Sequence, residues 1–315
     1  MAYRFRRKES VQAGLRRIVR EQIATAADYL DPPNAEGPEA EAAAPPAGHD
    51  PHEAVHEARK CFKKIRAALR LVRPSLKAVY SEENAWFRDV ARRLSRLRDA
   101  EALLETIDAL REAFAGEMGD ALWPPIQEAL TARRRRIAKE EVDLDERVAA
   151  VAAELREARG RVAALSLSDK EFDALAGGLR KTYARGRDAM VTAAEDPAAE
   201  NFHEWRKRAK YHRYHMDMMQ NVWPKELDAR RKSMHDLTDY LGDNHDLDVL
   251  RQTLLAEPDL APVERDRQTL LGLIGRRQED LQAGAHALGR RLYAEKPKAF
   301  VGRLASYWDA WKAGR

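Results

Sequence analysis

The chain has 315 residues, of which 44% are hydrophobic, 34% charged and 16 glycine, so it favours helices over a turn-rich β architecture and is long enough for two domains. The single cysteine, Cys61, excludes an internal disulfide, while the lack of an apolar signal core or long apolar run argues against secretion and membrane spans. We therefore expect a cytoplasmic protein without a membrane partner, and the small net charge of +4 leaves the choice of partner to the distribution of charges.

Periodic apolar residues predict helices along most of the chain, which gives an all-α fold class. The expected helices span about residues 8–30, 51–73, 82–114, 120–159, 169–194, 199–222, 224–256, 261–293 and 297–313. Residues 31–50 are rich in Pro, Ala and Glu and are predicted to form a mobile loop. Ser168 or Asp169 is expected to cap the helix that follows a boundary near residue 165. The sequence thus predicts one four-helix bundle in residues 1–165 and a second in residues 166–315.

An internal repeat determines how the rest of the chain is interpreted. The segment HEARK at 56–60 returns as HEWRK at 203–207, which is 147 residues later (203 − 56). The same offset relates residues of the following helix: Leu94, Asp99 and Leu103 match Leu241, Asp246 and Leu250. Duplication of a helical unit is the simplest explanation, so we expect two pseudo-symmetric bundles.

Both copies place apolar side chains on one helix face and cationic side chains on the opposite face. The cationic positions are His56, Arg59, Lys60, Lys63, Arg66 and Arg70 in the first copy, and His203, Arg206, Lys207, Lys210 and Arg213 in the second. An ordinary solvated face usually mixes both signs. Because like charges one turn apart repel by a few tenths of a kcal/mol, two such rows indicate an anionic partner. Arginine forks and lysine point charges suit the phosphates of a linear polyanion.

The two helices, each followed by an L-x-x-x-x-D-x-[ED]-x-L segment, resemble the conserved-histidine α-helical domain, CHAD, from about Glu9 to Tyr293. The resemblance implies two four-helix bundles around a central basic groove or pore that binds inorganic polyphosphate. It also implies association with polyphosphate granules and their proteins, without enzymatic activity, cofactor or metal. The family's histidines and basic positions correspond to the cationic positions of both rows. Asp99 and Asp246 are expected to orient the neighbouring cations, whereas His245 departs from the family's arginine at Arg98, which leaves its role open.

Further basic clusters could extend this surface, although ordinary helix-surface charge is the stronger explanation for them. The candidates for additional phosphate contacts are Arg16, Arg17 and Arg20 in the first helix and Arg180, Lys181, Tyr183 and Arg187 in the fifth. His212 falls on the apolar face and is predicted to be a packed structural residue.

One motif points to a different function, because His52 to His56 matches the zinc-binding pattern HExxH. The second copy has Ala199 in place of His52, and Arg59 and Lys60 would repel a bound cation. We therefore expect no metal site. Gly-rich phosphate loops, nucleophile elbows and the ExExK signature of triphosphate tunnel enzymes are also missing from the sequence, so we expect a binding protein and not an enzyme.

Nucleic acid is the alternative partner, because the same basic rows attract any phosphate backbone. Proteins that bind single strands usually add aromatic stacking platforms. Here Trp205 falls on the apolar face, and only Tyr211 and Tyr214 neighbour the basic one. Polyphosphate is therefore the preferred ligand and nucleic acid a weaker competitor, while a scaffold that recruits granule proteins is compatible with either.

Overall fold

The computed structural model describes residues 3–31, 51–94, 96–140 and 143–314, with only the backbone described at 51–52, 96–99 and 145. The described residues form helices joined by turns, and no β-strand occurs among them, which confirms the all-α prediction. The loop predicted for residues 31–50 lies almost entirely outside the described residues. No helix in the described ranges is both long and apolar enough to cross a bilayer.

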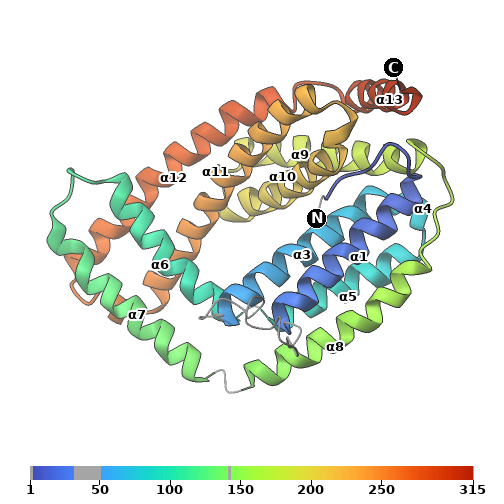
Figure 1. Ribbon diagram of the computed structural model, residues 1–315. Coiled ribbons are helices and arrows are strands. Elements are labelled where there is room, and N and C mark those ends of the chain that lie inside the picture. The colour runs from blue at the N-terminus through green and yellow to red at the C-terminus, as the bar shows by residue number, and fades with distance from the viewer. Residues whose placement is uncertain (1–2, 32–50, 95, 141–142, 315) are drawn as a thin grey trace.

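The first half of the chain forms a bundle around α3. Helix α3 packs against α1 and α5, and α1 packs against α8 (Figure 1). A short helix, α4, connects α3 to α5. The bounds are Val11–Leu30 for α1, Pro51–Leu71 for α3, Arg73–Leu76 for α4, Val79–Arg93 for α5 and Leu144–Ala163 for α8.

The second half forms a bundle of consecutive neighbours. Helix α9 packs against α10 and α13, α10 against α11, and α11 against α12. The bounds are Asp173–Glu195 for α9, Ala199–Met219 for α10, Pro224–Ala256 for α11, Glu264–Leu292 for α12 and Pro297–Ala313 for α13. One continuous apolar core extends through both bundles, from Leu15 and Phe62 to Trp205 and Phe300.

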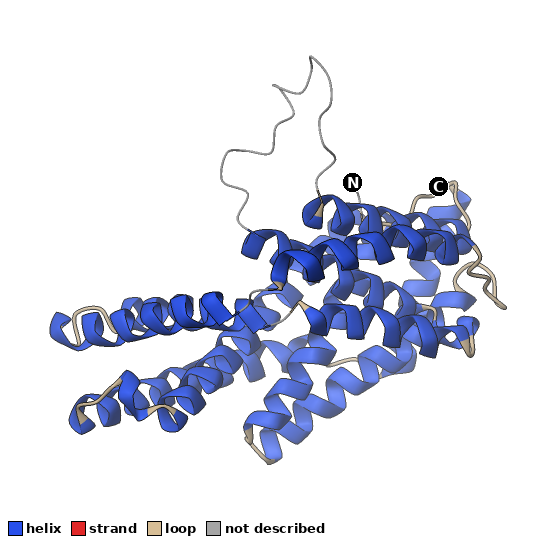
Figure 2. Cartoon of the chain, turned by 90° about the horizontal axis from the view of Figure 1, so that it is seen from below, coloured by secondary structure: helices blue, strands red, loops and turns tan. Residues whose placement is uncertain are grey.

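Two helices predicted as continuous are broken in the structure. The helix expected at 82–114 divides at buried Leu94 into α5 and α6, Arg96–Ala113, and the helix expected at 120–159 divides into α7, Trp123–Glu140, and α8. Helices α6 and α7 pack against α11 and α12 in an arm at one side of the main body (Figure 2). The breaks allow α5 and α8 to cover α3 and α1 while α6 and α7 bury a second core.

The arm brings counterparts of the repeat together. Leu103 and Ile107 of α6 lie in the same apolar cluster as Leu250 and Leu254 of α11, which are their counterparts at the 147-residue offset. This arrangement is compatible with a pseudo-symmetric fold. In the second copy, α11 runs unbroken through the region where α5 ends and α6 begins.

The predicted cap of the fifth helix is wrong. Helix α9 begins at Asp173, and Phe172 precedes it without a side-chain cap. Asp169 instead accepts a hydrogen bond from the Ser75 hydroxyl, with Ser75 Oγ 2.5 Å from Asp169 Oδ2. The Asp169 carboxylate therefore ties the connection between the bundles to α4 and does not cap a helix.

Close helix contacts join the two bundles. His215 of α10 lies with Nε2 3.0 Å from the carbonyl oxygen of Ala67 of α3. A Cβ on Gly178 of α9 would lie only 1.7 Å from the carbonyl oxygen of Leu71. Only glycine permits this approach, so the position of α9 against α3 depends on Gly178.

We expect Gly178→Ala to lower the free energy of unfolding by more than about 2 kcal/mol, because backbone must move to admit the methyl group. Urea denaturation measures the loss. The matched control is Gly302→Ala in α13, where a Cβ would meet nothing within 4 Å. There, the better helix propensity of alanine should raise stability by about 0.5–1 kcal/mol. Equal effects of both substitutions would contradict the proposed role of the close contact.

Candidate anion-binding site

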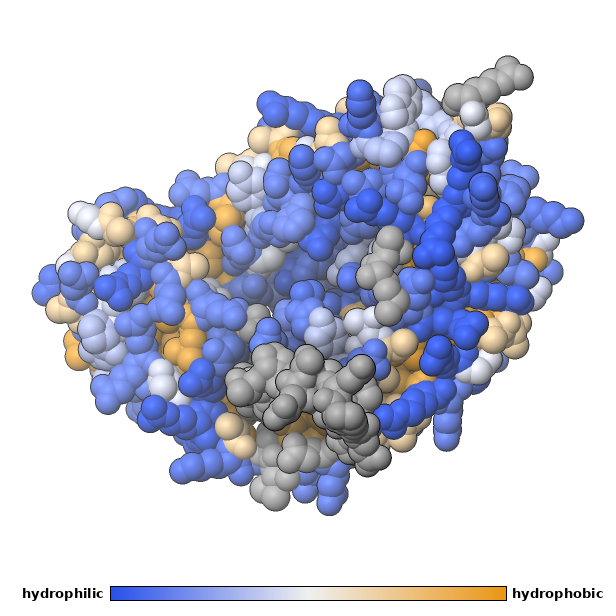
Figure 3. All heavy atoms as spheres, viewed as in Figure 1, coloured by the Kyte–Doolittle hydropathy of each residue, from blue (hydrophilic) through white to orange (hydrophobic). Residues whose placement is uncertain are grey.

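The two predicted basic faces meet where α3 crosses α10. The helices pack directly, and Lys63 and Lys210, which occupy the same position in the two copies, are close enough for Lys63 to lower the pKa of Lys210. Figure 3 shows a hydrophilic hollow in the middle of this side of the molecule. We call the paired surface the basic rows; its members are His56, Arg59, Lys60, Lys63, Arg66, Arg70, His203, Arg206, Lys207, Lys210 and Arg213.

Lys210 is half-buried at the crossing. Burial lowers its pKa most, and the positive charges of Arg206 and Lys63 lower it further, to about 7, although Asp246 acts in the opposite direction. Lys210 therefore loses its proton near neutral pH in the ligand-free protein. An anion bound beside it would favour the charged form and raise the pKa again.

Arg206 is oriented by α11 but incompletely satisfied. Its Nη2 lies 3.9 Å from Asp246 Oδ1, and its side chain is 20% exposed. The buried Nε has no hydrogen-bond acceptor among the described residues. An unsatisfied buried donor is unfavourable, so a phosphate oxygen that accepted from it would gain a charge-assisted bond. The side chain of Asp99, the counterpart of Asp246, lies outside the described side chains.

Neutral side chains hold the two arginines that share the next repeat position. Arg66 Nε donates to Asn84 Oδ1 of α5 at 3.2 Å, and Arg213 Nη1 donates to Thr238 Oγ1 of α11 at 3.0 Å. Because these acceptors are uncharged, they fix the guanidinium groups without neutralising them. Asp89 and Asp217 lie within electrostatic reach of Arg66 and Arg213, respectively.

His203 contacts a residue whose role the sequence left open. Its Nδ1 lies 3.3 Å from Nδ1 of His245 of α11, so one ring must donate to the other. Burial lowers the pKa of both rings, and the nearby cations, Arg206 among them, lower that of His245 further, to about 4. Both rings are therefore mainly neutral at pH 7. His245 joins the site, and the sequence signal for it was the replacement of the arginine expected at this repeat position.

Lys60 and Lys207 lie at the accessible edge of the rows. Their side chains are 45% and 48% exposed, and each binds the acidic residue one turn earlier: Lys60 Nζ lies 2.7 Å from Glu57 and Lys207 Nζ 2.6 Å from Glu204. His56 and Arg59 are half-buried and Lys63 is exposed on α3. The exposed pairs are weak, so a multivalent anion can replace the acidic partner at little cost.

The additional candidates in α1 lie together but carry structural bonds. Arg16, Arg17 and Arg20 line a shallow groove with Arg159 of α8. Arg16 Nε donates to the carbonyl oxygen of Leu165 at 2.7 Å, and Arg17 binds carboxylates of its own half of the chain. Both side chains therefore hold neighbouring segments in place, and only exposed Arg20 points to solvent without such a described role.

The additional candidates in α9 separate into different environments. Tyr183 is fully buried, stacks on Phe300 and donates to backbone carbonyl groups, so its ring lies outside the basic surface. Exposed Lys181 lines a cavity next to Arg70. Arg180 and Arg187 lie on α9 outside that cavity. His212 is 2% exposed among aromatic rings, as its place on the apolar face predicts.

The fold defines an all-helical class of domain in which two related helices carry basic faces, and comparisons identify the family. The sequence model of the CHAD domain matches residues 38–255, so the chain belongs to the CHAD family. CHAD domains are associated with polyphosphate binding in general. The chain is similar in fold to the crystal structure of the CHAD domain from the plant Ricinus communis, with 18% identity and a TM-score of 0.59. That match covers 92% of this chain and 95% of the plant chain. Comparison with curated proteins finds no match.

We expect Lys210→Met to raise the free energy of unfolding at pH 7, by about 2 kcal/mol, because it removes a half-buried charge that lies among cations. The pKa of Lys210 is lowered on folding, so the unfolded chain binds the proton more tightly, and the cost declines as pH rises from 7 to 10. Urea denaturation at both values should therefore show a larger gain at pH 7. Lys207→Met on the exposed edge of α10 should change stability by less than about 0.5 kcal/mol. A loss of stability in Lys210→Met would refute this electrostatic account.

Proposed function

We propose that this chain binds inorganic polyphosphate along the basic rows of α3 and α10, without chemical change to the polymer. The observation that carries the proposal is the crossing, where half-buried Lys210 lies within reach of the positive charges of Arg206 and Lys63. Folding places these like charges together at an energetic cost. A polyanion that bound there would add negative charge beside these cations and release its own condensed counterions.

A linear polymer suits this arrangement better than a single phosphate group. The rows extend over both helices, from His56 to Arg70 and from His203 to Arg213, and so offer a succession of donors. The tethered guanidinium groups of Arg66 and Arg213 present fixed forks, while exposed Lys60 and Lys207 can adapt to the phosphate spacing. A repeating anion satisfies many of these groups at once.

Nucleic acid is favoured less, because the aromatic side chains near the rows are unavailable for base stacking. Trp205 is 0% and Tyr214 7% exposed. The ring of Tyr211 is covered by the guanidinium of Arg70, with Arg70 Cζ 4.1 Å from its centre. Single-strand binding proteins use exposed rings as platforms. The described residues of the rows contain charge without such platforms, so polyphosphate should outcompete nucleic acid.

The proposal includes the cellular setting that polyphosphate binding implies. A cytoplasmic protein of this kind would lie on polyphosphate granules and could contact other granule-associated proteins. His203 and His245 would then act as donors to bound phosphate once the anion raises their pKa values, and not as catalysts of hydrolysis. Incubation with long-chain polyphosphate should leave the chain length unchanged, as measured by gel electrophoresis.

We expect Lys60→Glu/Lys207→Glu to weaken binding of long-chain polyphosphate and to reduce its salt dependence. The slope of log affinity against log salt counts ionic contacts, at roughly 0.7 per contact for a single strand, so losing two contacts should reduce it by about 1.4. Fluorescence anisotropy across a salt series measures both quantities. The control Lys232→Glu/Lys298→Glu makes the same charge change on α11 and α13, outside the rows.

In the same assay, competition with single-stranded and duplex nucleic acid tests the choice of ligand. The proposal requires polyphosphate to displace nucleic acid from the wild type. Equal or tighter binding of nucleic acid would favour the alternative function. If the control variant loses as much affinity as Lys60→Glu/Lys207→Glu, the net charge of the protein and not the basic rows governs binding.

We expect the affinity for polyphosphate to rise about 10-fold as pH falls from 8 to 6, because binding raises the pKa of Lys210 from about 7 and so takes up a proton. Calorimetry in buffers of different ionisation enthalpy measures this proton uptake. Lys210→Arg keeps the charge at every pH, so it should bind more tightly than the wild type at pH 8 and lose most of the pH dependence. A wild type with a flat pH profile would contradict the role of Lys210.

A further inference from the structure

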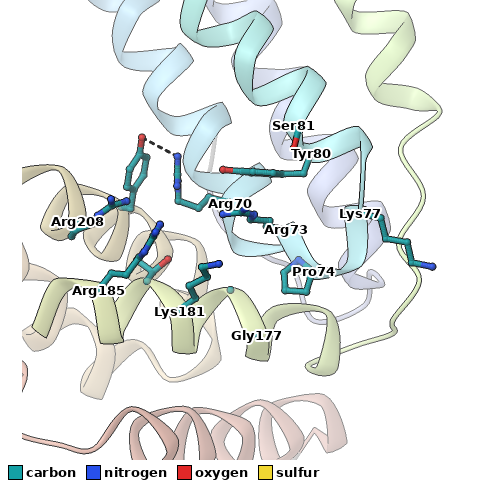
Figure 4. Close-up of a pocket in the computed structure, with 13 residues that line it drawn as sticks. Arg70, Arg73, Pro74, Lys77, Tyr80, Ser81, Gly177, Lys181, Arg185 and Arg208 are labelled. Atoms are coloured by element: carbon teal, nitrogen blue, oxygen red, sulfur yellow. Dashed lines mark hydrogen bonds between the residues drawn. The ribbon is translucent and has the colours of Figure 1, made fainter. Parts of the chain in front are cut away.

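A cavity lies beside the crossing, between α3, α4 and α5 on one side and α9 and α10 on the other (Figure 4). Its volume is about 290 Å³. Ligand pockets usually measure roughly 300–1,000 Å³, so this one suits a compact ligand. No acidic side chain belongs to its described lining, whereas six cations do: Arg70, Arg73, Lys77, Lys181, Arg185 and Arg208.

The cations of the cavity converge on one another. In Figure 4, Lys181 and Arg185 extend from α9 toward Arg70 and Arg73, while Lys77 points away. The charge of Arg73 is the largest cause of the lowered pKa of Lys181. Burial and then neighbouring guanidinium groups lower the pKa of Arg185. The buried Nε of Arg70 has no acceptor among the described residues. The ligand-free cavity therefore holds mutual repulsion and an unsatisfied donor.

The repeat provides an internal comparison. The sequence AGLRR at 13–17 in α1 resembles GGLRK at 177–181 in α9, at an offset of 164 residues (177 − 13) that is longer than the 147 of the later helices, so Arg17 is the counterpart of Lys181. Arg17 donates to both carboxylate oxygens of Glu9, with Nε 2.9 Å from Oε2 and Nη2 2.6 Å from Oε1. In the first copy, the chain itself thus supplies an anion at this position.

The segment before α1 also fills the groove that corresponds to the cavity. Phe5 is 1% exposed; its N–H donates to the carbonyl oxygen of Met218 at 2.9 Å, and its carbonyl oxygen accepts from Asn221 Nδ2 at 2.9 Å. At the repeat offset, Met218 and Asn221 correspond to Leu71 and Pro74. Pro74 lines the cavity. The same place in the fold is therefore covered in one copy and open in the other.

The segment before α9 takes a different course. The N–H of Ser168 donates to the carbonyl oxygen of Ser75 at 3.1 Å, and Asp169 accepts from the Ser75 hydroxyl. These bonds hold the segment beside α4, so it does not cover the cavity. The carboxylate of Glu204 pairs with Arg208 and also with Lys207, and that of Asp169 interacts with Lys77 at the edge of the cavity. Glu204 also acts on Arg185, but burial and the guanidinium groups of Arg208, Arg70 and Arg73 have larger, opposite effects on its pKa.

The aromatic side chains of the cavity argue against a nucleotide. The guanidinium of Arg73 lies over the ring of Tyr80, with Cζ 4.7 Å from the ring centre, and that of Arg70 lies over Tyr211 at 4.1 Å. The rings therefore stabilise cations and are not presented as platforms for a base. A ligand that consists of phosphate alone uses the lining fully.

We propose that this cavity, which shares Arg70 with the basic rows but is otherwise lined by other residues, is a second anion site that binds a short inorganic oligophosphate, either free or as the terminal units of a polyphosphate chain. The site would replace the carboxylate that Glu9 supplies in the first copy. Only the chain-terminal source rests on the proposed function, because a free oligophosphate would bind whether or not the rows bind a polymer.

The test is calorimetric titration with inorganic tripolyphosphate at 0.15 M salt. We expect one tight site per chain, and Lys181→Ala/Arg185→Ala should weaken it by about 10- to 100-fold, since two charge-assisted hydrogen bonds are lost. Both residues are exposed on a helix, so the variant should fold, as circular dichroism can verify. The matched control is Arg290→Ala/Arg291→Ala, which removes two exposed cations from α12 and should change the affinity by less than twofold.

The variant of the rows, Lys60→Glu/Lys207→Glu, separates the two sites. It should lower the affinity for long-chain polyphosphate while leaving the affinity for tripolyphosphate within about threefold of the wild-type value. If Lys60→Glu/Lys207→Glu weakened the binding of tripolyphosphate as much as Lys181→Ala/Arg185→Ala does, the cavity would be part of one continuous surface and the proposal would be overturned. Failure of tripolyphosphate to bind, while the long polymer binds, would overturn the cavity site alone. If tripolyphosphate binds and the long polymer does not, the proposed function would be overturned instead.

Two further ligands test whether the bound oligophosphate is free or chain-terminal, and whether it is inorganic. If chain ends occupy the cavity, Lys181→Ala/Arg185→Ala should also weaken the binding of long-chain polyphosphate, when the polymer is supplied at the same concentration of chain ends as tripolyphosphate. If only free oligophosphate enters the cavity, long-chain polyphosphate should bind this variant and the wild type with the same affinity. Tighter binding of a nucleoside triphosphate than of tripolyphosphate would overturn the assignment to an inorganic ligand.

Discussion

The crossing of α3 over α10 is the constraint on which the rest of the structure depends. Apolar faces and close contacts, such as that between His215 of α10 and the carbonyl oxygen of Ala67 of α3, hold the two helices together. Their opposite faces carry like charges, and the crossing brings Lys63 and Lys210 into each other's field. The core behind the helices must outweigh this repulsion. Burial of apolar surface, which is non-directional and large in sum, can do so even though the acidic partners described for the rows are few.

A surface built in this way is poised for a ligand and not optimised for stability. Lys210 is held near its point of titration, Arg206 keeps an unsatisfied donor, and Arg66 and Arg213 are fixed by neutral acceptors. Each feature lowers the stability of the protein slightly and, under the proposed function, would strengthen binding of an anion. Natural proteins accept such costs where function requires them.

The basic rows could be predicted from sequence because they depend on local geometry. A helix of 3.6 residues per turn places His203, Arg206 and Lys210 on one face wherever the helix packs, and the repeat identified the same face in α3. The break at Leu94 could not be predicted in this way, since residues on both sides of it favour helix. Only the packing of α6 against α11 separates it from α5. Likewise, Asp169 was expected to cap α9, but the tertiary contact with Ser75 governs its position.

Of the cavity's cations, Arg70 and Lys181 were sequence candidates, whereas Arg73, Lys77, Arg185 and Arg208 were missed for the same reason. Arg208 falls between the basic and apolar faces of α10, and Arg185 has no counterpart in the motif. They meet only because α9 lies across the end of α3. His245 was visible in the sequence as a departure from the repeat, but its contact with His203 required the structure. Residues whose role depends on a neighbouring helix leave little periodic signal.

The segment that precedes each bundle has consequences for how duplicated units diverge. Before α1, the chain fills the groove with the buried ring of Phe5, and the carboxylate of Glu9 accepts hydrogen bonds from Arg17. Before α9, the equivalent stretch is diverted to Ser75. Two copies of one unit have thus become a closed half and a receptive half, through the route of a short connection more than through change in the helices themselves. In such a protein, the evolution of new specificity can begin in the linker.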